Sequence, residues 1–184
     1  MLAAVKALLL NDTPGNDTAY ATELRHAGYD VVRCSPPGEA HFPCVGIEGD
    51  CPLDATVDVA VVIHEKASTG LAAGEAGVVC ALRDGVPLVV AGNGAATPFG
   101  ESVAAVAAGV HDVVGACERA IGGSLSRTGR QLGGRLERDG DAVHLELDGD
   151  ATEADAVRAH RALRTAFPAA RVIDVGGVAP PADS

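Results

Sequence analysis

The sequence predicts an α/β protein with a doubly wound, five-stranded parallel sheet and a small additional ββαβ unit near its C-terminal end. Three observations lead to this fold class. Short apolar runs of strand length alternate with segments of helical spacing through residue 121. Several runs are apolar throughout, which is typical of parallel strands buried on both faces. A pattern of alternating polar and apolar residues, typical of a hairpin, appears only after residue 134.

The first region, residues 1–121, supplies the elements of the parallel sheet. Asn16 or Asp17 is placed to cap the first helix, and Gly28 is placed to end it. Gly85 gives a similar stop to the second helix. We expect strands over 3–10, 29–34, 57–64, 86–92 and 111–115, and helices over 16–27, 70–85, 98–109 and 117–121.

The remaining residues change in composition and in pattern. Residues 122–134 gain Gly and Ser and lose acidic residues, so we expect a linker, with a partly helical segment as the alternative. Residues 135–176 are expected to form the ββαβ unit, with a hairpin turning at Asp139-Gly140, a helix over 152–168 and a strand over 170–176. Thr152 and Asp155 predict a capping box at the start of that helix. The last residues, 177–184, are expected to be a disordered tail.

Composition and charge exclude several classes of function. Apolar residues make up 47% of the 184 residues, which is enough for a core, but aromatic residues make up only 3% and Trp is absent. Recognition of nucleic acid by aromatic stacking is therefore not expected. The net charge of −11 also repels phosphate backbones and anionic membranes. The N-terminal apolar run breaks at Asn11-Asp12 and reads as a strand rather than a signal peptide, so we expect a cytoplasmic protein.

Three of the five cysteines are spaced closely, one at the end of the second expected strand and two in the long segment after it. The pattern Cys34-x6-His41-x2-Cys44-x6-Cys51 places four candidate metal ligands together. Zinc accepts three thiolates and one imidazole, and thiolates also hold iron–sulfur clusters. A Cys44–Cys51 disulfide and free loop thiols are the alternatives. Cys80 and Cys117 lie on Ala-rich helices and are expected to be buried as small apolar side chains.

The carboxyl edge of the expected sheet gathers further candidates, because parallel strands end at one edge and ligands bind there in open α/β sheets. His64 ends the third strand and is an alternative fourth ligand to His41, although a His at this place also serves to bond a backbone carbonyl. Asp12 follows the first strand. A weak anion-binding signal lies after the fourth strand at Gly92, Asn93 and Gly94, where an ordinary βα loop is the alternative and no nucleotide is expected.

The segments VDVAVVIH (57–64), VPLVVAG (86–92) and AAGVHDVVGAC (107–117) resemble the third to fifth strands of the receiver domain of bacterial response regulators, a flavodoxin-like fold. The resemblance implies a site for aspartyl phosphate. Asn11-Asp12 stands where the family has its acidic metal-binding residues, so one carboxylate remains there. The phosphoacceptor position falls on Ile63 or His64. The hydroxyl position falls on Gly92 and the lysine position on Ala116. The resemblance therefore implies a pseudo-receiver, without the phosphotransfer reaction.

The segment DGDAVHLELDGDATEADAVRAHRAL (139–163) is similar to a BON module, a small fold of a hairpin, a helix and a strand. That resemblance implies contact with an envelope or lipid, which the acidic balance opposes.

Together these patterns favour a non-catalytic signalling or regulatory protein whose cysteine loop responds to a metal or to redox state, with zinc or an iron–sulfur cluster as cofactor. One alternative is a small enzyme that acts on a nucleoside or phosphorylated substrate through Asp12, His64 and Glu65. Another is a purely structural partner-binding protein. Because the ββαβ unit is too small to bury both a hairpin edge and a helix, we expect a homodimer through this unit. The sequence does not name any other protein partner.

Overall fold

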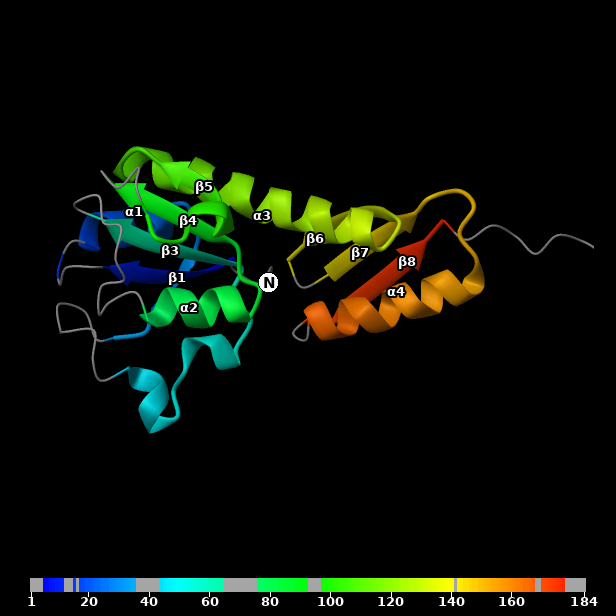
Figure 1. Cartoon of the computed structure of the whole chain (residues 1–184), viewed down its shortest axis with the longest axis horizontal. Coiled ribbons are helices and arrows are strands. Elements are labelled where there is room, and N and C mark those ends of the chain that lie inside the picture. The colour runs from blue at the N-terminus through cyan, green and yellow to red at the C-terminus, as the bar shows by residue number, and fades with distance from the viewer. Residues whose placement is uncertain are drawn as a thin grey trace, which may run out of the picture. The chain divides into compact units, whose positions relative to one another are not determined.

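The computed structural model describes residues 5–11, 15, 17–35, 44–64, 76–92, 97–140, 142–167 and 170–177. The chain divides into two compact units, with the boundary between Gly122 and Gly123. The first unit is built on a five-stranded sheet and the second on a three-stranded sheet (Figure 1).

The five strands of the first unit are all parallel and follow the order β2-β1-β3-β4-β5. This order is that of flavodoxin-like folds, in which the strand sequence reverses beside the first strand. The predicted fold class is therefore confirmed. The strands are β1 (Lys6–Asn11), β2 (Asp30–Arg33), β3 (Val59–His64), β4 (Leu88–Gly92) and β5 (Val103–Ala107).

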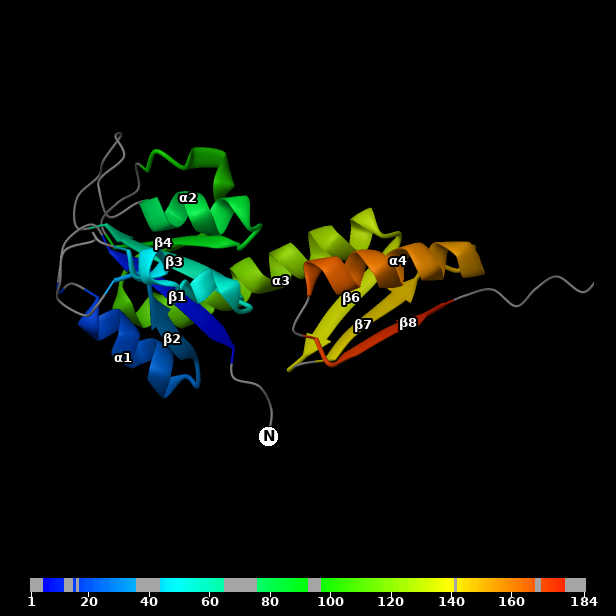
Figure 2. The ribbon, with the colours of Figure 1, turned by 90° about the horizontal axis from the view of Figure 1, so that it is seen from below.

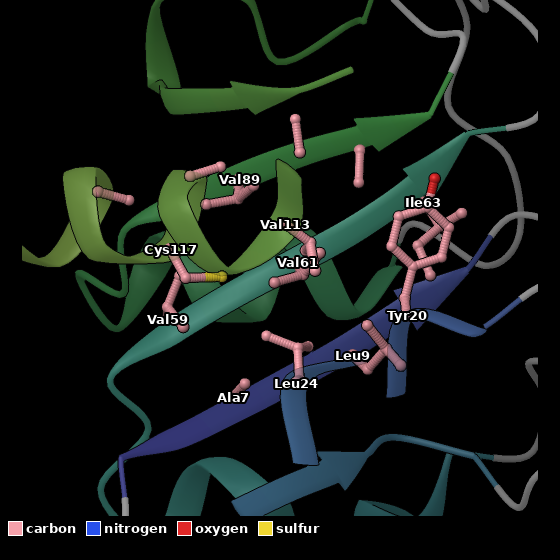
Figure 3. Close-up of a cluster of buried hydrophobic side chains, with 14 of the residues drawn as sticks. Ala7, Leu9, Tyr20, Leu24, Val59, Val61, Ile63, Val89, Val113 and Cys117 are labelled. Atoms are coloured by element: carbon pink, nitrogen blue, oxygen red, sulfur yellow. The ribbon is translucent and has the colours of Figure 1, made fainter. Parts of the chain in front are cut away.

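One face of this sheet is covered by α1 (Thr18–His26) and by the first half of α3 (Val113–Gln131). Figure 3 shows Cys117 of α3 above Val59 and Tyr20 of α1 beside Ile63. The buried residues of α3 on this face recur at intervals of three and four, the spacing that places them on one side of a helix. These residues are Val113, Ala116, Cys117 and Ala120.

The other face of the sheet is covered by α2 (Ala76–Arg83) together with irregular segments. Residues 44–54, which contain the short 3₁₀ turns η1 (Val45–Glu48) and η2 (Pro52–Asp54), lie on the same side of the sheet as α2 (Figures 1 and 2, cyan). Leu53 from this segment and Phe99 from the β4–β5 connection pack on the apolar cluster there. Residues 70–75 of the expected helix 70–85 lie outside the described residues.

The expected helix over 98–109 and the expected strand over 111–115 are both wrong. Residues 103–107 form β5, preceded by a 3₁₀ turn at Gly100–Ser102, and helix α3 begins at Val113. Pairing with β4 outweighs the helix preference of the alanines in VAAVA, whose two valines favour a strand. The pair 111–112 belongs to a further 3₁₀ turn, Val110–Asp112, that leads directly into α3.

The segment 122–134, expected to be a linker with some helix as the alternative, is helical for most of its length, and the boundary between the two compact units falls near its start. Helix α3 runs without a break through Gln131, and β6 begins at Gly134. The glycines that favour a linker weaken a helix in isolation, but tertiary packing compensates here. Leu125 and Leu132 pack on the core of the second unit.

The second unit contains the predicted hairpin, β6 (Gly134–Asp139) and β7 (Ala142–Leu147), followed by α4 (Glu153–Ala166) and β8 (Val172–Gly176). Strand β7 pairs antiparallel with β6 and parallel with β8. The predicted capping box is present, because the Thr152 side chain accepts from the Asp155 N–H and the Asp155 carboxylate accepts from the Thr152 N–H. Leu145 and Leu163 are fully buried in the core of this unit.

Residues 178–184 of the expected tail lie outside the described residues. Within the described part of the chain, none of the helices is both long enough and apolar enough to cross a membrane.

Candidate functional site

The sequence-predicted site residues divide into two groups. The described ones lie at the ends of strands, or in residues 44–54 on the face of the sheet that α2 also covers: Cys34, Cys44, Cys51, His64 and Gly92. The others lie outside the described residues: Asp12, His41, Asn93 and Gly94, together with Glu65.

Cys34 follows β2 directly and is the residue around which the other cysteines gather. Its side chain is half-buried and packs on the apolar cluster between the sheet and α2. The end of β2 is held in place by a buried ion pair, in which Arg33 Nε donates to Asp17 Oδ2 at 2.5 Å. Because Asp17 stands at the start of α1, this pair ties the helix to the strand end from which Cys34 emerges.

Cys44 and Cys51 flank the 3₁₀ turn η1 and lie close to each other. The Gly46 N–H donates to the Cys44 sulfur at 3.4 Å, which makes Cys44 the N-cap of that turn. A Cβ placed on Gly46 would lie 3.4 Å from the sulfur of Cys44 and 3.4 Å from the sulfur of Cys51. The two sulfurs are therefore no more than twice that distance apart, and Gly46 keeps the space between them open.

Two observations connect this turn to Cys34. The Val45 N–H donates to the Cys34 carbonyl oxygen at 3.0 Å, and the thiols of Cys44 and Cys51 lie near enough to Cys34 to influence the pKa of its thiol. Burial, as the largest cause, and the nearby thiols together raise the pKa of Cys34 to about 12. Cys34 is therefore a protonated thiol at neutral pH, with other thiols nearby.

Cys80 on α2 also belongs to this neighbourhood, which the sequence analysis did not predict. Cys80 is among the thiols whose proximity raises the pKa of Cys34. Its side chain is half-buried, so the expectation of a buried apolar side chain holds only for Cys117, which is fully buried on the other face of the sheet. We call Cys34, Cys44, Cys51 and Cys80 the cysteine cluster.

The cysteine cluster is a set of free thiols in the structure. All five cysteines of the chain are free, so the Cys44–Cys51 disulfide considered as an alternative is not formed. Within the described ranges, no group of three or more His, Cys, Asp or Glu side chains is already arranged to hold a metal ion. The thiols are neighbours, but in the described structure no three of them form a metal site.

His64 ends β3 as predicted, and its side chain is 1% exposed. The strand register places Cys34 level with Val62, with β1 between them, and His64 two residues further along. With strands about 4.8 Å apart and a rise of about 3.3 Å per residue, the two backbones are offset by about 10 Å across and about 7 Å along the sheet. The register therefore does not bring His64 to the cysteine cluster.

Gly92 at the end of β4 has a packing role. Its backbone φ of +94° lies in the left-handed region, and a Cβ there would lie 2.4 Å from the His64 carbonyl oxygen and 3.6 Å from the Tyr20 hydroxyl. No side chain larger than hydrogen fits this position. Asn93 and Gly94 lie outside the described residues, so the anion-binding prediction stays untested.

The positions that carry chemistry in receiver domains can be located on the observed strands. Strand β3 ends at His64 and β4 at Gly92, as the resemblance implies. The lysine position does not fall on Ala116, which is buried within α3. The residues at the end of β5 are Ala107 and Ala108, so the observed strand end does not supply a lysine either.

Comparison with known protein families finds no matching family model, and comparison with curated proteins finds no matching sequence. The resemblances to receiver domains and BON modules therefore rest on the residues quoted for them and on the strand order.

Replacement of Gly92 by Ala tests the contact at the end of β4. We expect Gly92→Ala to lower the free energy of unfolding of the first unit by more than about 2 kcal/mol, because it adds a steric clash to the backbone cost of about 1–2 kcal/mol. Gly28→Ala is the matched control, since Gly28 has a φ of +89° with open space around it. Tyrosine fluorescence during urea unfolding measures both, because the chain's two tyrosines, Tyr20 and Tyr29, lie in the first unit. If Gly92→Ala and Gly28→Ala lowered the free energy of unfolding by the same amount, the clash at Gly92 would cost nothing and the prediction would be wrong.

Proposed function

We propose that this chain is a non-catalytic regulatory protein that responds to a soft metal ion through its cysteine cluster. The observation that carries the proposal is the contact of Cys34 with the turn that bears Cys44 and Cys51. Three thiols from two segments gather over one edge of the sheet. Cysteine thiolates are common ligands of zinc and of iron–sulfur clusters.

The chemistry of the cluster favours metal binding over catalysis. A nucleophilic cysteine needs a lowered pKa, but burial and neighbouring thiols raise that of Cys34 to about 12. Metal binding removes this cost, because a cation replaces the protons and screens the thiolates from one another. When bound, zinc would supply structural cross-linking of its ligands rather than reaction chemistry.

The receiver-like part of the chain is proposed to serve as a scaffold and not as a phosphoacceptor. By the resemblance, the acceptor carboxylate of receivers is replaced by Ile63 or His64 at the end of β3, and the hydroxyl group by Gly92 at the end of β4. An aspartyl phosphate needs both the nucleophile and a metal-binding set of carboxylates beside it. We also place the protein in the cytoplasm. The chain has five cysteines, an odd number that does not suit a disulfide framework, and thiols stay reduced in the cytoplasm.

Homodimerisation is part of the proposal. Strands β6 and β8 each pair only with β7, so both edges of the small sheet lack a partner strand in the described structure. Val172 on β8 is 50% exposed. An edge strand with an exposed apolar side chain favours pairing with a second copy.

Metal uptake by the metal-free protein tests the proposed function. We expect one equivalent of zinc to bind and to slow amide exchange at residues 44–54, because an ion shared by Cys34, Cys44 and Cys51 ties this segment to the end of β2. Elemental analysis and hydrogen exchange measure the two effects. Protein purified without oxygen is examined by absorption at the same time, since an iron–sulfur cluster gives a visible band. Failure to bind either zinc or a cluster would refute the proposal.

Treatment with acetyl phosphate tests the loss of the receiver reaction. We expect the mass of the protein to stay unchanged, because His64 and Gly92 replace the reacting groups. A receiver domain that keeps its aspartate serves as the positive control. Phosphate found on a carboxylate within residues 57–66 would contradict the proposal.

Sedimentation equilibrium of the full chain tests the dimer. We expect a dimer at micromolar concentration, and we expect Val172→Lys to weaken association by about tenfold or more, since lysine on an edge strand opposes pairing. Val79→Lys, at a valine of α2 that is 53% exposed, is the matched control and should leave association unchanged. A monomeric full-length protein would contradict the proposal.

A further inference from the structure

Helix α2 directs one flank toward Cys34. Gly77 lies on that flank, and a Cβ built on it would lie 2.6 Å from Leu10 Cδ2 and 3.3 Å from the Cys34 sulfur. A larger residue would push the helix away from the strand end. The absence of a side chain at Gly77 therefore allows α2 to approach Cys34 closely.

Cys80 follows Gly77 by three residues, so both lie on the same side of the helix, one turn apart. Val78 and Ala81 occupy the side buried against the sheet, and Cys80 is only half-buried beside them. This places Cys80 at the margin of the helix where Cys34 and the 44–54 segment lie, and not in the apolar core.

We infer that Cys80 is the fourth thiolate of a closed zinc site formed with Cys34, Cys44 and Cys51. The inference rests on the proposed function and deepens it by completing the ligand set. Structural zinc is bound by four ligands in a tetrahedron, and four cysteines are one of its usual sets. The register sets His64 apart from Cys34 by an intervening strand, whereas the Cys34 sulfur lies close enough to α2 that a Cβ on Gly77 would meet it at 3.3 Å.

The binding step balances as an exchange of protons for the ion. Each of the four thiols loses its proton to solvent, and each thiolate donates an electron pair to zinc at about 2.3 Å. As they lie in the described part of the chain, no three of these side chains could hold a metal ion, so the proposed site requires the sulfurs of the 44–54 segment and of α2 to move toward Cys34 when zinc binds. The bound ion then joins β2, the 44–54 segment and α2.

Paired alanine variants of the full chain test this assignment. We expect Cys80→Ala to weaken zinc binding by about 100-fold or more, measured by competition with a chromophoric chelator, because one of four bonds is lost. Cys117→Ala is the matched control, a cysteine-to-alanine change in a helix on the opposite face, and should keep the wild-type affinity. Cys80→His restores a ligand and should recover most of the affinity, with an altered absorption spectrum of the cobalt-substituted protein.

Alkylation of the wild-type protein gives a second measurement that does not depend on how a variant folds. We expect zinc to slow the reaction of Cys80 with a maleimide by about tenfold or more, as it slows that of Cys44 and Cys51, when the sites are read by mass spectrometry.

The outcomes separate the two claims. Unchanged alkylation of Cys80 with zinc bound, or wild-type affinity in Cys80→Ala, overturns the fourth ligand and leaves the proposed function standing. Failure of the wild-type protein to bind zinc overturns the four-thiolate zinc site. The proposed function falls with it only if an iron–sulfur cluster is absent as well.

Discussion

Burial of the three central strands on both faces is the constraint on which the first unit depends. The side chains of β3 are buried along its whole length, and those of β1 and β4 over most of theirs. Such strands are stable only where other segments cover each face of the sheet. On one face two helices do this, but on the other the eight residues of α2 are joined by residues 44–54 and by the β4–β5 connection. The cysteine cluster lies in this composite cover.

That arrangement explains how a segment without long helices packs against the sheet. Leu53 contacts the same apolar cluster as Val78 of α2, and the Val45 N–H bonds the end of β2. The segment is therefore anchored by apolar burial and backbone hydrogen bonds before any ion is considered. A metal ion in this setting would add a constraint to a segment that already has a defined place.

The strands could be predicted from the sequence where apolar runs are long and bounded by turn residues, and the hairpin at Asp139-Gly140 could be predicted from its turn. The strand β5 could not, because the short run VAAVA has the composition of a helix and becomes a strand only by pairing with β4. The start of α3 carried a readable signal in the spacing of Val113, Ala116, Cys117 and Ala120. Cys80 was missed because its neighbours come from β2 and the 44–54 segment, and spacing along one helix does not reveal that contact.

Helix α3 begins in one compact unit and ends in the other, with Gly122 and Gly123 near its middle. A protease or a gene truncation that separated the units at this boundary would divide one helix into two pieces shorter than an isolated helix needs to persist in water. The core neighbours of Ile121 all lie in the first unit and those of Leu125 all lie in the second, so each half of α3 keeps its own packing after such a cut. The two units thus have separate cores but share one helix, and each fragment would depend on its own core to keep its half of α3 helical.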